Sequence, residues 1–293
     1  VCLVGDDQTV VEVSLKEFLA EVSLDKKPTC ILPNSDGRGY GYFRYDESSL
    51  QWVMKNWAKI DDVTCRQSQL MNLYEEYQHE RIDADAFLKC LLTGLQVEDN
   101  ALIASTVCGY IGRALIETKD RSLDADVLSL AETHPLKSCR QQLLRRLIAA
   151  SSDSLVCRKL YDIWQEASHP LLNENDYMNL AYELSVRNPE MQQDIITRQL
   201  GRISNPDRRR QFEFISRATT PDTLKQEALF RQLLKAENRR IEPWALETLE
   251  YLCHPLREEQ AVRYIKDALE ALPYIQRTSD IFFPQDWSYS LLN

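Results

Sequence analysis

The sequence changes character once, within residues 30–57. Before this stretch, β-branched residues in short alternations are typical of strands, and after it apolar residues recur at the spacing of a helix face. Only 8 glycines occur in 293 residues, and four of them precede Tyr42. Because glycine weakens a helix, its scarcity after Tyr42 also favours helices. We therefore predict a small β segment joined to a long array of helices.

The junction between the two parts carries its own local signals. Residues Pro33–Gly37 have the sequence PNSDG between two apolar runs, which predicts a hairpin or tight loop. Glycine alternates with aromatic residues over Gly39–Tyr45, which predicts a strand with close backbone approach. Asp46 and Ser48 are both candidate N-caps of the first helix, and Ser48 has capping-box spacing to Gln51. The apolar stripe of that helix is formed by Leu50, Val53, Met54 and Trp57.

Hydrophobic periodicity and turn signals place the remaining elements. The predicted strands are Val1–Val4, Val10–Leu15, Thr29–Leu32 and Gly39–Tyr45. The segment Lys16–Leu24 fits either a short helix or a strand plus loop. About twelve helices are expected from Asp46 onward. The first six are Ser48–Ile60, Val63–Gln78, Ala84–Leu95, Asn100–Glu117, Ala125–Glu132 and Leu136–Ala149.

Proline marks many of the later helix starts, since its missing N–H has no partner in the first helical turn. From residue 134 onward, helical patterns begin at His134-Pro135, His169-Pro170, Asn188-Pro189, Asn205-Pro206, Thr220-Pro221, Glu242-Pro243 and His254-Pro255. The helices are therefore short and the loops tight, which favours stacked antiparallel pairs. We predict a mainly α fold, an α-superhelix of HEAT/armadillo-like helix pairs preceded by a few β-strands. Residues 1–45 would be the terminal strands of a small β-sandwich or β appendage, and residues 46–293 the helical superhelix domain.

Charge and hydropathy limit the partners. The net charge is −10 and the isoelectric point is near 5.1, which argues against nucleic acid. The one dense basic run, Arg208–Arg210, follows a helix cap and predicts a solvated helix face. No apolar window is long enough to predict a membrane span. No signal peptide is visible, but the chain opens on Val1 rather than methionine, so we expect it to be cut from a longer protein.

Eight cysteines are scattered without a CxxC pair, at positions 2, 30, 65, 90, 108, 139, 157 and 253. A disulfide framework is typical of shorter chains, and Cys90 and Cys108 lie in apolar helical patterns, where buried free thiols are common. This pattern favours reduced cysteines and, weakly, a cytoplasmic location; periplasmic and secreted locations stay open.

None of the sequence patterns predicts a catalytic centre. His79-Glu80 begins like the zinc motif H-E-x-x-H, but Asp83 stands where the second histidine would be. Three of the four histidines directly precede proline, which predicts loop and cap roles. Gly37–Gly41 matches neither a P-loop nor GxGxxG. Paired acids such as Glu75-Glu76 and Glu98-Asp99 fit exposed helix ends. We therefore predict no catalytic, cofactor-binding or metal-binding residue in this chain.

Several motifs nevertheless resemble one enzyme family in order along the chain. They are Leu32-Pro33-Asn34 with Gly39-Tyr40, Tyr45-Asp46-x-Ser48-Ser49-Leu50, Asp61 with Arg66, Leu91-Leu92-x-x-Leu95-x-x-Glu98-Asp99-Asn100, Arg239-Arg240-x-x-Pro243-Trp244, and Ser279–Pro284 with Trp287. This series resembles the end of the β-sandwich and the C-terminal helical domain of zinc aminopeptidases of the aminopeptidase N type, and its closing segments are similar to those of bacterial members.

The resemblance implies a parent enzyme with an N-terminal β domain, a thermolysin-like catalytic domain, a β-sandwich and a helical superhelix. The HExxH zinc motif and the GxMEN loop of the family would lie upstream and have no match here, so zinc belongs to the parent and no cofactor to this chain. The resemblance implies that the helical domain caps the active-site cavity and helps peptide substrates to enter and be recognised. Its partners would be the missing N-terminal and catalytic domains and peptide substrates.

A second hypothesis is a freestanding helical-repeat scaffold that binds protein partners. The two hypotheses differ at the β segment: a fragment should expose apolar residues there, whereas a complete scaffold should cover them. Val11 and Val13 are the strand residues that we expect to face the missing domains. The aromatic tail, residues 280–292, fits packing of the last helix, with docking to a partner as the alternative.

Overall fold

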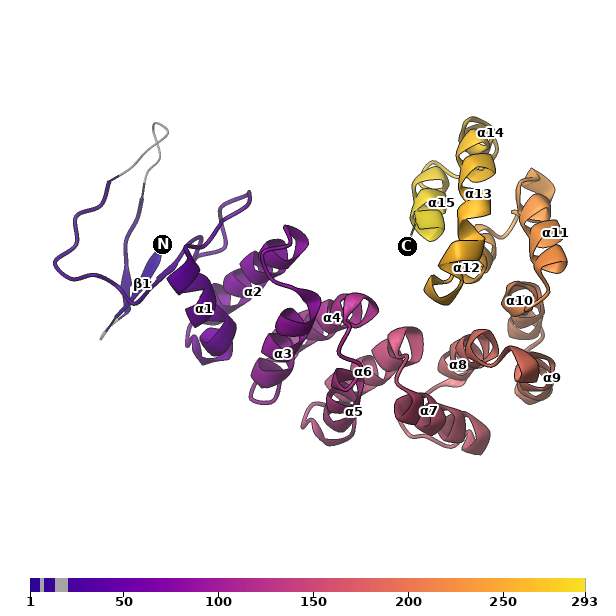
Figure 1. Ribbon diagram of the computed structural model, residues 1–293, viewed down its shortest axis with the longest axis horizontal. Helices are drawn as coiled ribbons and strands as arrows, with labels where there is room; N and C mark the ends of the chain where they lie inside the picture. Colours follow the sequence, from indigo (N-terminus) through magenta and orange to yellow (C-terminus); the bar gives the residue numbers. More distant parts are fainter. Residues whose placement is uncertain (6–7, 14–20, 293) are drawn as a thin grey trace. The chain divides into compact units, whose positions relative to one another are not determined.

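The computed structural model describes residues 1–5, 8–13 and 21–292. Three short strands precede the helices: β1 (Cys2–Val4), β2 (Gln8–Val10) and β3 (Cys30–Leu32). They form an antiparallel sheet in the order β2-β1-β3. In its register, Cys2 lies opposite Val10 on one side and Leu32 on the other. Fifteen α-helices follow within the described residues, so the mainly α fold with few preceding strands is confirmed (Figure 1).

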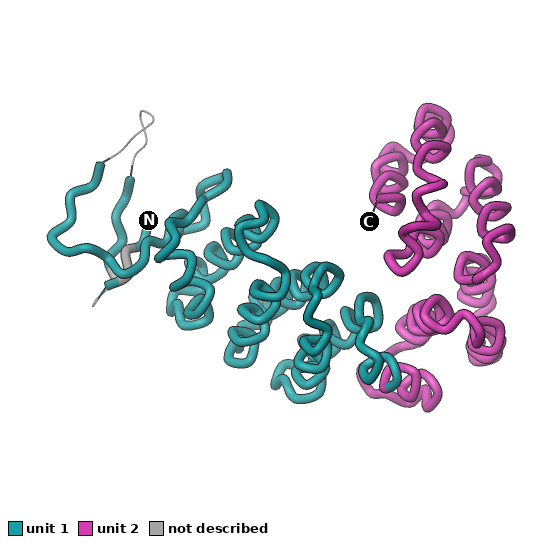
Figure 2. Tube along the Cα trace, viewed as in Figure 1, with its two compact units in different colours: residues 1–158 teal, residues 159–293 magenta. Residues whose placement is uncertain are grey.

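The chain divides into two compact units, residues 1–158 and 159–293 (Figure 2). The helices of unit 1 are α1 (Glu47–Asn56), α2 (Val63–Gln78), α3 (Ala84–Leu95), α4 (Ala101–Glu117), α5 (Leu123–Thr133) and α6 (Lys137–Ala150), with the 3₁₀ helix η1 (Trp57–Lys59) after α1. The division falls within α7 (Ser154–Glu166). The sheet belongs to unit 1 with the first helices. The expected domain boundary between residues 45 and 46 stays a prediction.

Unit 1 is a two-layered stack of helix pairs. Helices α1, α3 and α5 form one layer, and α2, α4 and α6 form the other (Figure 1). The expected bounds of α2 and α3 are confirmed to the residue, and those of the other four helices to within a few residues. Asp83 caps α3 and Asn100 caps α4 by accepting backbone N–H groups. Strong periodicity explains why this part is predictable, together with the side-chain caps of α2, α3 and α4.

Unit 2 continues with short helices and tight turns. Its helices are α8 (Glu174–Arg187), α9 (Gln192–Arg202), α10 (Pro206–Ile215), α11 (Thr223–Leu233), α12 (Glu242–Leu252), α13 (Glu258–Glu270), α14 (Leu272–Thr278) and α15 (Phe283–Leu292). The 3₁₀ helices between them are η2 (Pro189–Met191), η3 (Ser216–Thr219), η4 (Ala236–Asn238) and η5 (Pro255–Arg257). Helix α8 packs with α9, α10 with α12, and α12 with α15. In the tail, Phe283, Trp287 and Leu291 are buried, so the packing interpretation is confirmed for this face of α15.

The β segment differs most from expectation. Gly39–Tyr45 is not a strand, because the side chain of Asn34 takes both backbone groups of Gly39: its amide donates to the carbonyl over 3.2 Å, and its oxygen accepts the N–H over 2.7 Å. The strand expected at Val10–Leu15 is instead β2, and residues 11–13 are irregular. Residues 14–20 lie outside the described residues, and residues 21–24 are irregular, so Lys16–Leu24 is settled only for its end.

Candidate functional site

Among the described residues, the sheet of unit 1 is covered on part of one face. Cys2, Cys30 and Leu32 are buried, because α1 packs against β3. Val10 lies opposite Cys2 in the register and on the same face, yet its side chain is 74% exposed. A β-branched residue in this position normally packs against another layer. Strand β2 therefore presents an apolar side chain where the described chain offers no cover.

Other apolar side chains around the sheet are also exposed. We define the junction surface as the exposed apolar and aromatic residues described within residues 1–45: Val10, Val22, Leu24, Ile31, Tyr40 and Tyr42. Tyr40 is the extreme case, with its side chain wholly in solvent at the tip of the loop that leads to α1. Single exposed apolar residues are normal on a protein surface, but so many within a short segment are typical of a docking surface.

The loop that carries Tyr40 is fixed by its base. Residues 34–37 make the expected turn, with the N–H of Gly37 donating to the carbonyl of Asn34 over 3.0 Å. Asn34 and Gly37 both have positive φ angles, of 49° and 67°. A Cβ at Gly39 would lie 2.6 Å from Phe43 and 2.9 Å from the Asn34 oxygen, so a larger residue here would displace the ring of Phe43 and the Asn34 side chain that holds the turn. The turn prediction is confirmed, and the exposed Tyr40 stands on an ordered loop.

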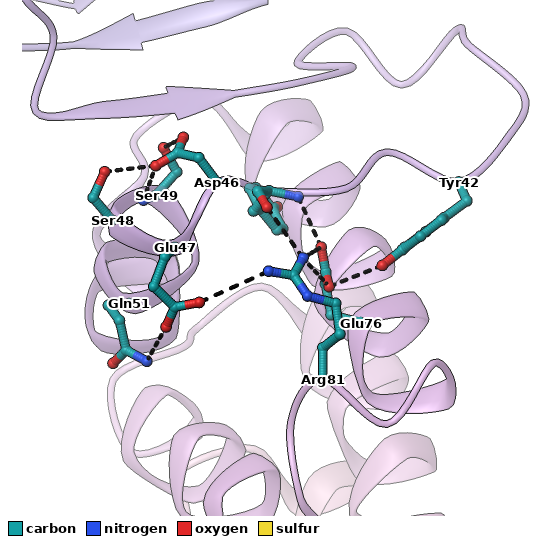
Figure 3. Close-up of polar contacts among 9 residues, drawn as sticks. Tyr42, Asp46, Glu47, Ser48, Ser49, Gln51, Glu76 and Arg81 are labelled. Atoms are coloured by element: carbon teal, nitrogen blue, oxygen red, sulfur yellow. Dashed lines mark hydrogen bonds and ion pairs between the residues drawn. The ribbon is translucent and has the colours of Figure 1, made fainter.

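A buried carboxylate joins this loop to the helices. The side chain of Glu76 on α2 is fully buried and accepts the hydroxyl of Tyr42 over 3.0 Å and the N–H of Tyr45 over 2.8 Å (Figure 3). Arg81 donates to both of its oxygens, over 2.7 and 2.9 Å, and to the carbonyl of Tyr45 over 3.1 Å. Glu47 of α1 lies 3.8 Å from the same guanidinium. Loop, α1 and α2 thus share one charge-assisted network.

The burial of Glu76 beside Arg81 contradicts a prediction from the sequence. The paired acids Glu75-Glu76 and Glu98-Asp99 were expected on exposed helix ends, but the structure buries Glu76 and Glu98. Glu98 pairs with the buried guanidinium of Arg66 over 2.8 Å. Both carboxylates find arginine partners, which is what permits a charge to be buried. The prediction was wrong because the position of a residue along a helix does not show whether another part of the chain packs against it. The loop covers one face of α2, and this could not be read from the sequence.

The start of α1 also differs in part from expectation. Asp46 is the N-cap: its Oδ1 accepts the N–H of Ser49 over 3.0 Å (Figure 3). These contacts lower the pKa of Asp46 to about 2, the Ser48 and Ser49 hydroxyls contributing most. The capping box of Ser48 with Gln51 is wrong, because Ser48 donates to Asp46 and Gln51 donates to Glu47. Aspartate at the first position outcompetes serine two residues later.

One hydroxyl connects the sheet to the same cap. Ser49 Oγ accepts the N–H of Ile31 over 2.9 Å and donates to Asp46 Oδ2 over 2.5 Å. The start of α1 therefore occupies the outer edge of β3. The N–H of Ile31 is bound there and is not available to another strand. The uncovered part of the sheet lies at β2 instead.

The histidines and cysteines take structural places. His134, His169 and His254 each accept an N–H two residues later through Nδ1, so their predicted cap roles are confirmed. His79 stacks on Tyr42 with ring centroids 4.0 Å apart. The cysteines at positions 30, 65, 90, 108, 139 and 253 are free thiols, and Cys90 and Cys108 are buried as expected. Among the described residues, no group of three or more His, Cys, Asp or Glu could hold a metal ion, and no helix is both long and apolar enough to cross a bilayer.

The basic run lies on the surface as expected. Arg208 pairs with Glu174 over 2.5 Å, Arg209 with Glu213 over 3.5 Å, and Arg210 with Asp207. All three side chains are 43% exposed or more. The solvated helix face after the Asn205 cap is therefore confirmed.

Unit 2 contains a second polar cluster, in which the buried Tyr182 of α8 lies near the half-buried Glu247 of α12. Tyr182 of α8 is fully buried between the rings of Phe212 and Tyr251, with centroids 4.8 and 5.2 Å away. Glu247 of α12 lies near both tyrosines and Gln211. Burial, reinforced by the charge of Glu250, raises the pKa of Glu247 to about 7. This carboxylate has no arginine partner in the described structure, unlike Glu76 and Glu98.

Glu247 should make unit 2 less stable as the pH rises. In the unfolded chain a glutamate loses its proton near pH 4.3, whereas folded Glu247 holds it to about pH 7. Between these values the folded state binds more protons, so the free energy of unfolding falls with rising pH. Glu247 is only half-buried and solvent screens its charge, so the total fall should be on the order of 2 kcal/mol, less than the full pKa difference implies. Urea unfolding at pH 4.5–7.5 should show this slope, and Glu247→Gln should flatten it. An unchanged slope in the variant would contradict the assignment.

Each unit also contains a shallow groove between helices. In unit 1 the groove lies between α3 and α5 and has a volume of about 410 Å³, with Lys89, Thr93 and Asp126 in its lining. In unit 2 it lies between α9 and α11 and has a volume of about 390 Å³, with Gln193, Arg217 and Lys225. Thr133 and His134 also line the first groove, and both ring nitrogens of His134 have backbone partners: Nδ1 accepts the N–H of Leu136 over 3.2 Å, and Nε2 lies 2.9 Å from the carbonyl of Leu95.

The site that the structure brings together is thus the junction surface with the Glu76 network beneath it. Sequence reasoning identified the turn and Asp46, but it predicted a strand where the tyrosine-rich loop lies. It also missed Glu76 and Arg81, which lie 31–36 residues from their partners in that loop. In comparisons with known proteins, no family model and no curated protein matches this chain.

Proposed function

We propose that this chain is the C-terminal part of a zinc aminopeptidase of the aminopeptidase N type, and that it is itself non-catalytic. It docks to the rest of the polypeptide through the junction surface, caps the active-site cavity and helps peptide substrates to enter. The observation that carries the proposal is the exposure of Val10 on the sheet face where Cys2 and Leu32 are buried. A freestanding scaffold should cover this position.

The resembling motifs also meet in space, which supports the proposal. Arg66 and Glu98 come from two separate motifs and form one buried ion pair. Near the C-terminus, the guanidinium of Arg239 lies 6.0 Å from the ring of Trp287, and Glu242 accepts the N–H of Asp280 over 2.8 Å. Residues that interact in this way constrain one another. If this chain and the aminopeptidases have the same fold, we expect them to have these motifs in the same order.

The sequence encoded upstream of Val1 tests the proposal most directly. It should contain HExxH followed by a third zinc ligand, and a GxMEN loop before it. The isolated chain should contain no stoichiometric zinc and hydrolyse no aminoacyl-coumarin. An upstream sequence without the zinc motif would refute the proposal, and stoichiometric zinc with turnover in the isolated chain would refute its non-catalytic part.

Docking through the junction surface can be measured by reassociation. We expect Val10→Asp to weaken binding to the separately expressed upstream polypeptide by roughly tenfold or more, because a buried carboxylate at an interface costs at least about 1.4 kcal/mol. Val97→Asp is the matched control, since Val97 is 70% exposed in a turn of unit 1 between α3 and α4. Val11→Asp and Val13→Asp test the two half-buried neighbours. Equal effects of Val10→Asp and Val97→Asp would contradict docking at this surface.

A further inference from the structure

Two of the cysteines face each other across the core of unit 1. Cys108 lies in the middle of α4 and Cys139 in the first turn of α6. Their sulfur atoms are 3.4 Å apart, and both side chains are buried. Helices α4 and α6 pack closely along their length. The packing of α4 against α6 therefore holds the two thiols in contact.

The two sulfurs are chemically unequal. Cys139 is the third residue of α6, where the free N–H groups and the helix dipole favour a thiolate. Either thiol can donate to the other, and the thiol of Cys108 also lies 4.0 Å from the carbonyl of Cys139. With Cys108 as the donor, this contact lowers the pKa of Cys139, and together with burial it raises the pKa of Cys108. Cys139 is thus the nucleophile of the pair and Cys108 the thiol that can resolve it. Burial alone raises the pKa of Cys253 to about 12, so that thiol is inert by comparison.

The start of α6 is also the place where this helix can open. Its N-cap position is Leu136, and no side chain caps the first turn. Lys137 and Ser138, which precede Cys139, are exposed. Uncapped first turns belong to the least stable parts of a fold and fray without global unfolding. A small oxidant can reach Cys139 through this turn while α4 holds Cys108 in place.

We propose that Cys108 and Cys139 form an oxidisable dithiol, a modification site at which a peroxide joins α4 to α6 through a disulfide. The Cys139 thiolate attacks the peroxide, so that an S–O bond forms, the O–O bond breaks and hydroxide leaves. Cys108 then loses its proton and attacks the sulfenic acid of Cys139, an S–S bond forms, and the S–O bond breaks. Two thiols are oxidised and one hydrogen peroxide is reduced to two waters. Reduction by a small dithiol reverses the change.

The test uses the intact chain with hydrogen peroxide as the oxidant. After treatment, free thiols are alkylated and peptides are mapped by mass spectrometry without reduction. We expect the peptides that contain Cys108 and Cys139 to be joined, while Cys253 and Cys90 remain alkylated. The disulfide closes a loop of about 30 residues, so the Tm of unit 1 should rise by roughly 5–10 °C and fall again on reduction.

Variants separate the pair from general oxidation. Cys139→Ser should abolish the reaction at both positions, whereas Cys108→Ser should leave Cys139 as a sulfenic acid that dimedone traps. Peroxide that leaves Cys108 and Cys139 alkylated would overturn the proposal. So would oxidation of Cys139 to sulfinic acid in the unmutated chain without a joined peptide, or joining of Cys139 to the other cysteines as often as to Cys108.

Discussion

Replacing Arg81 with methionine should destabilise unit 1 by about 3 kcal/mol. The methionine fills much of the space of the arginine stem but leaves the carboxylate of Glu76 buried without its counter-charge. Tyr42 and the N–H of Tyr45 still donate to it, but two hydrogen bonds do not compensate for the lost guanidinium. Hydrogen exchange of α2, and urea unfolding followed by fluorescence of Trp52 and Trp57, would measure the loss.

Two controls make this prediction specific to the network. Arg38→Met removes an arginine whose ion pair with Asp36 is 3.8 Å long and largely exposed, so we expect a loss of about 0.5 kcal/mol or less. In the double variant Arg81→Met/Glu76→Met no charge remains buried, and the protein should recover part of the stability lost in Arg81→Met. If Arg81→Met were no more harmful than Arg38→Met, the network would not hold the loop in place.

The same network shows where prediction from the sequence succeeds. Helices α2 and α3 were predictable because their signals are local: apolar residues at helical spacing, with Asp62 or Asp83 as a cap. The Asn34 turn was predictable for the same reason. The predicted strand at Gly39–Tyr45 does not form, because the side chain of Asn34 makes the backbone hydrogen bonds that a neighbouring strand would otherwise make.

Long-range contacts explain what the sequence did not reveal about the site. Glu75 and Glu76 are adjacent acids, and only the docking of a loop more than 30 residues away buries the second of them. Glu98 is likewise buried by Arg66, across 32 residues. No local pattern distinguishes such a carboxylate from a solvated one. The only signal in the sequence is an isolated arginine three residues after the end of a helix, as at Arg81, and it is a weak one.

A second large effect on the stability of unit 1 is expected where the end of α1 packs against α3. Trp57 is buried after α1, and its Nε1 donates to the carbonyl of Cys90 over 3.3 Å. A Cβ at Gly94 would lie 2.1 Å from the ring of Trp57. Both the ring and the helix backbone are fixed by their surroundings, so neither can move away cheaply. We expect Gly94→Ala to lower the free energy of unfolding of unit 1 by about 3 kcal/mol, despite the higher helix propensity of alanine.

Gly109 is the matched control, because it also lies inside a helix of unit 1, α4. Apart from its chain neighbours and the adjacent backbone of α4, no described atom lies within 4 Å of an added Cβ. There only helix propensity acts, and Gly109→Ala should stabilise unit 1 by about 0.5–1 kcal/mol. We therefore expect the same substitution to change the free energy of unfolding in opposite directions at the two positions. Urea unfolding of both variants and of the unmutated chain measures this. If both substitutions stabilised unit 1, Trp57 would be able to move away from α3. The end of α1 would then not be fixed against the helices that follow it.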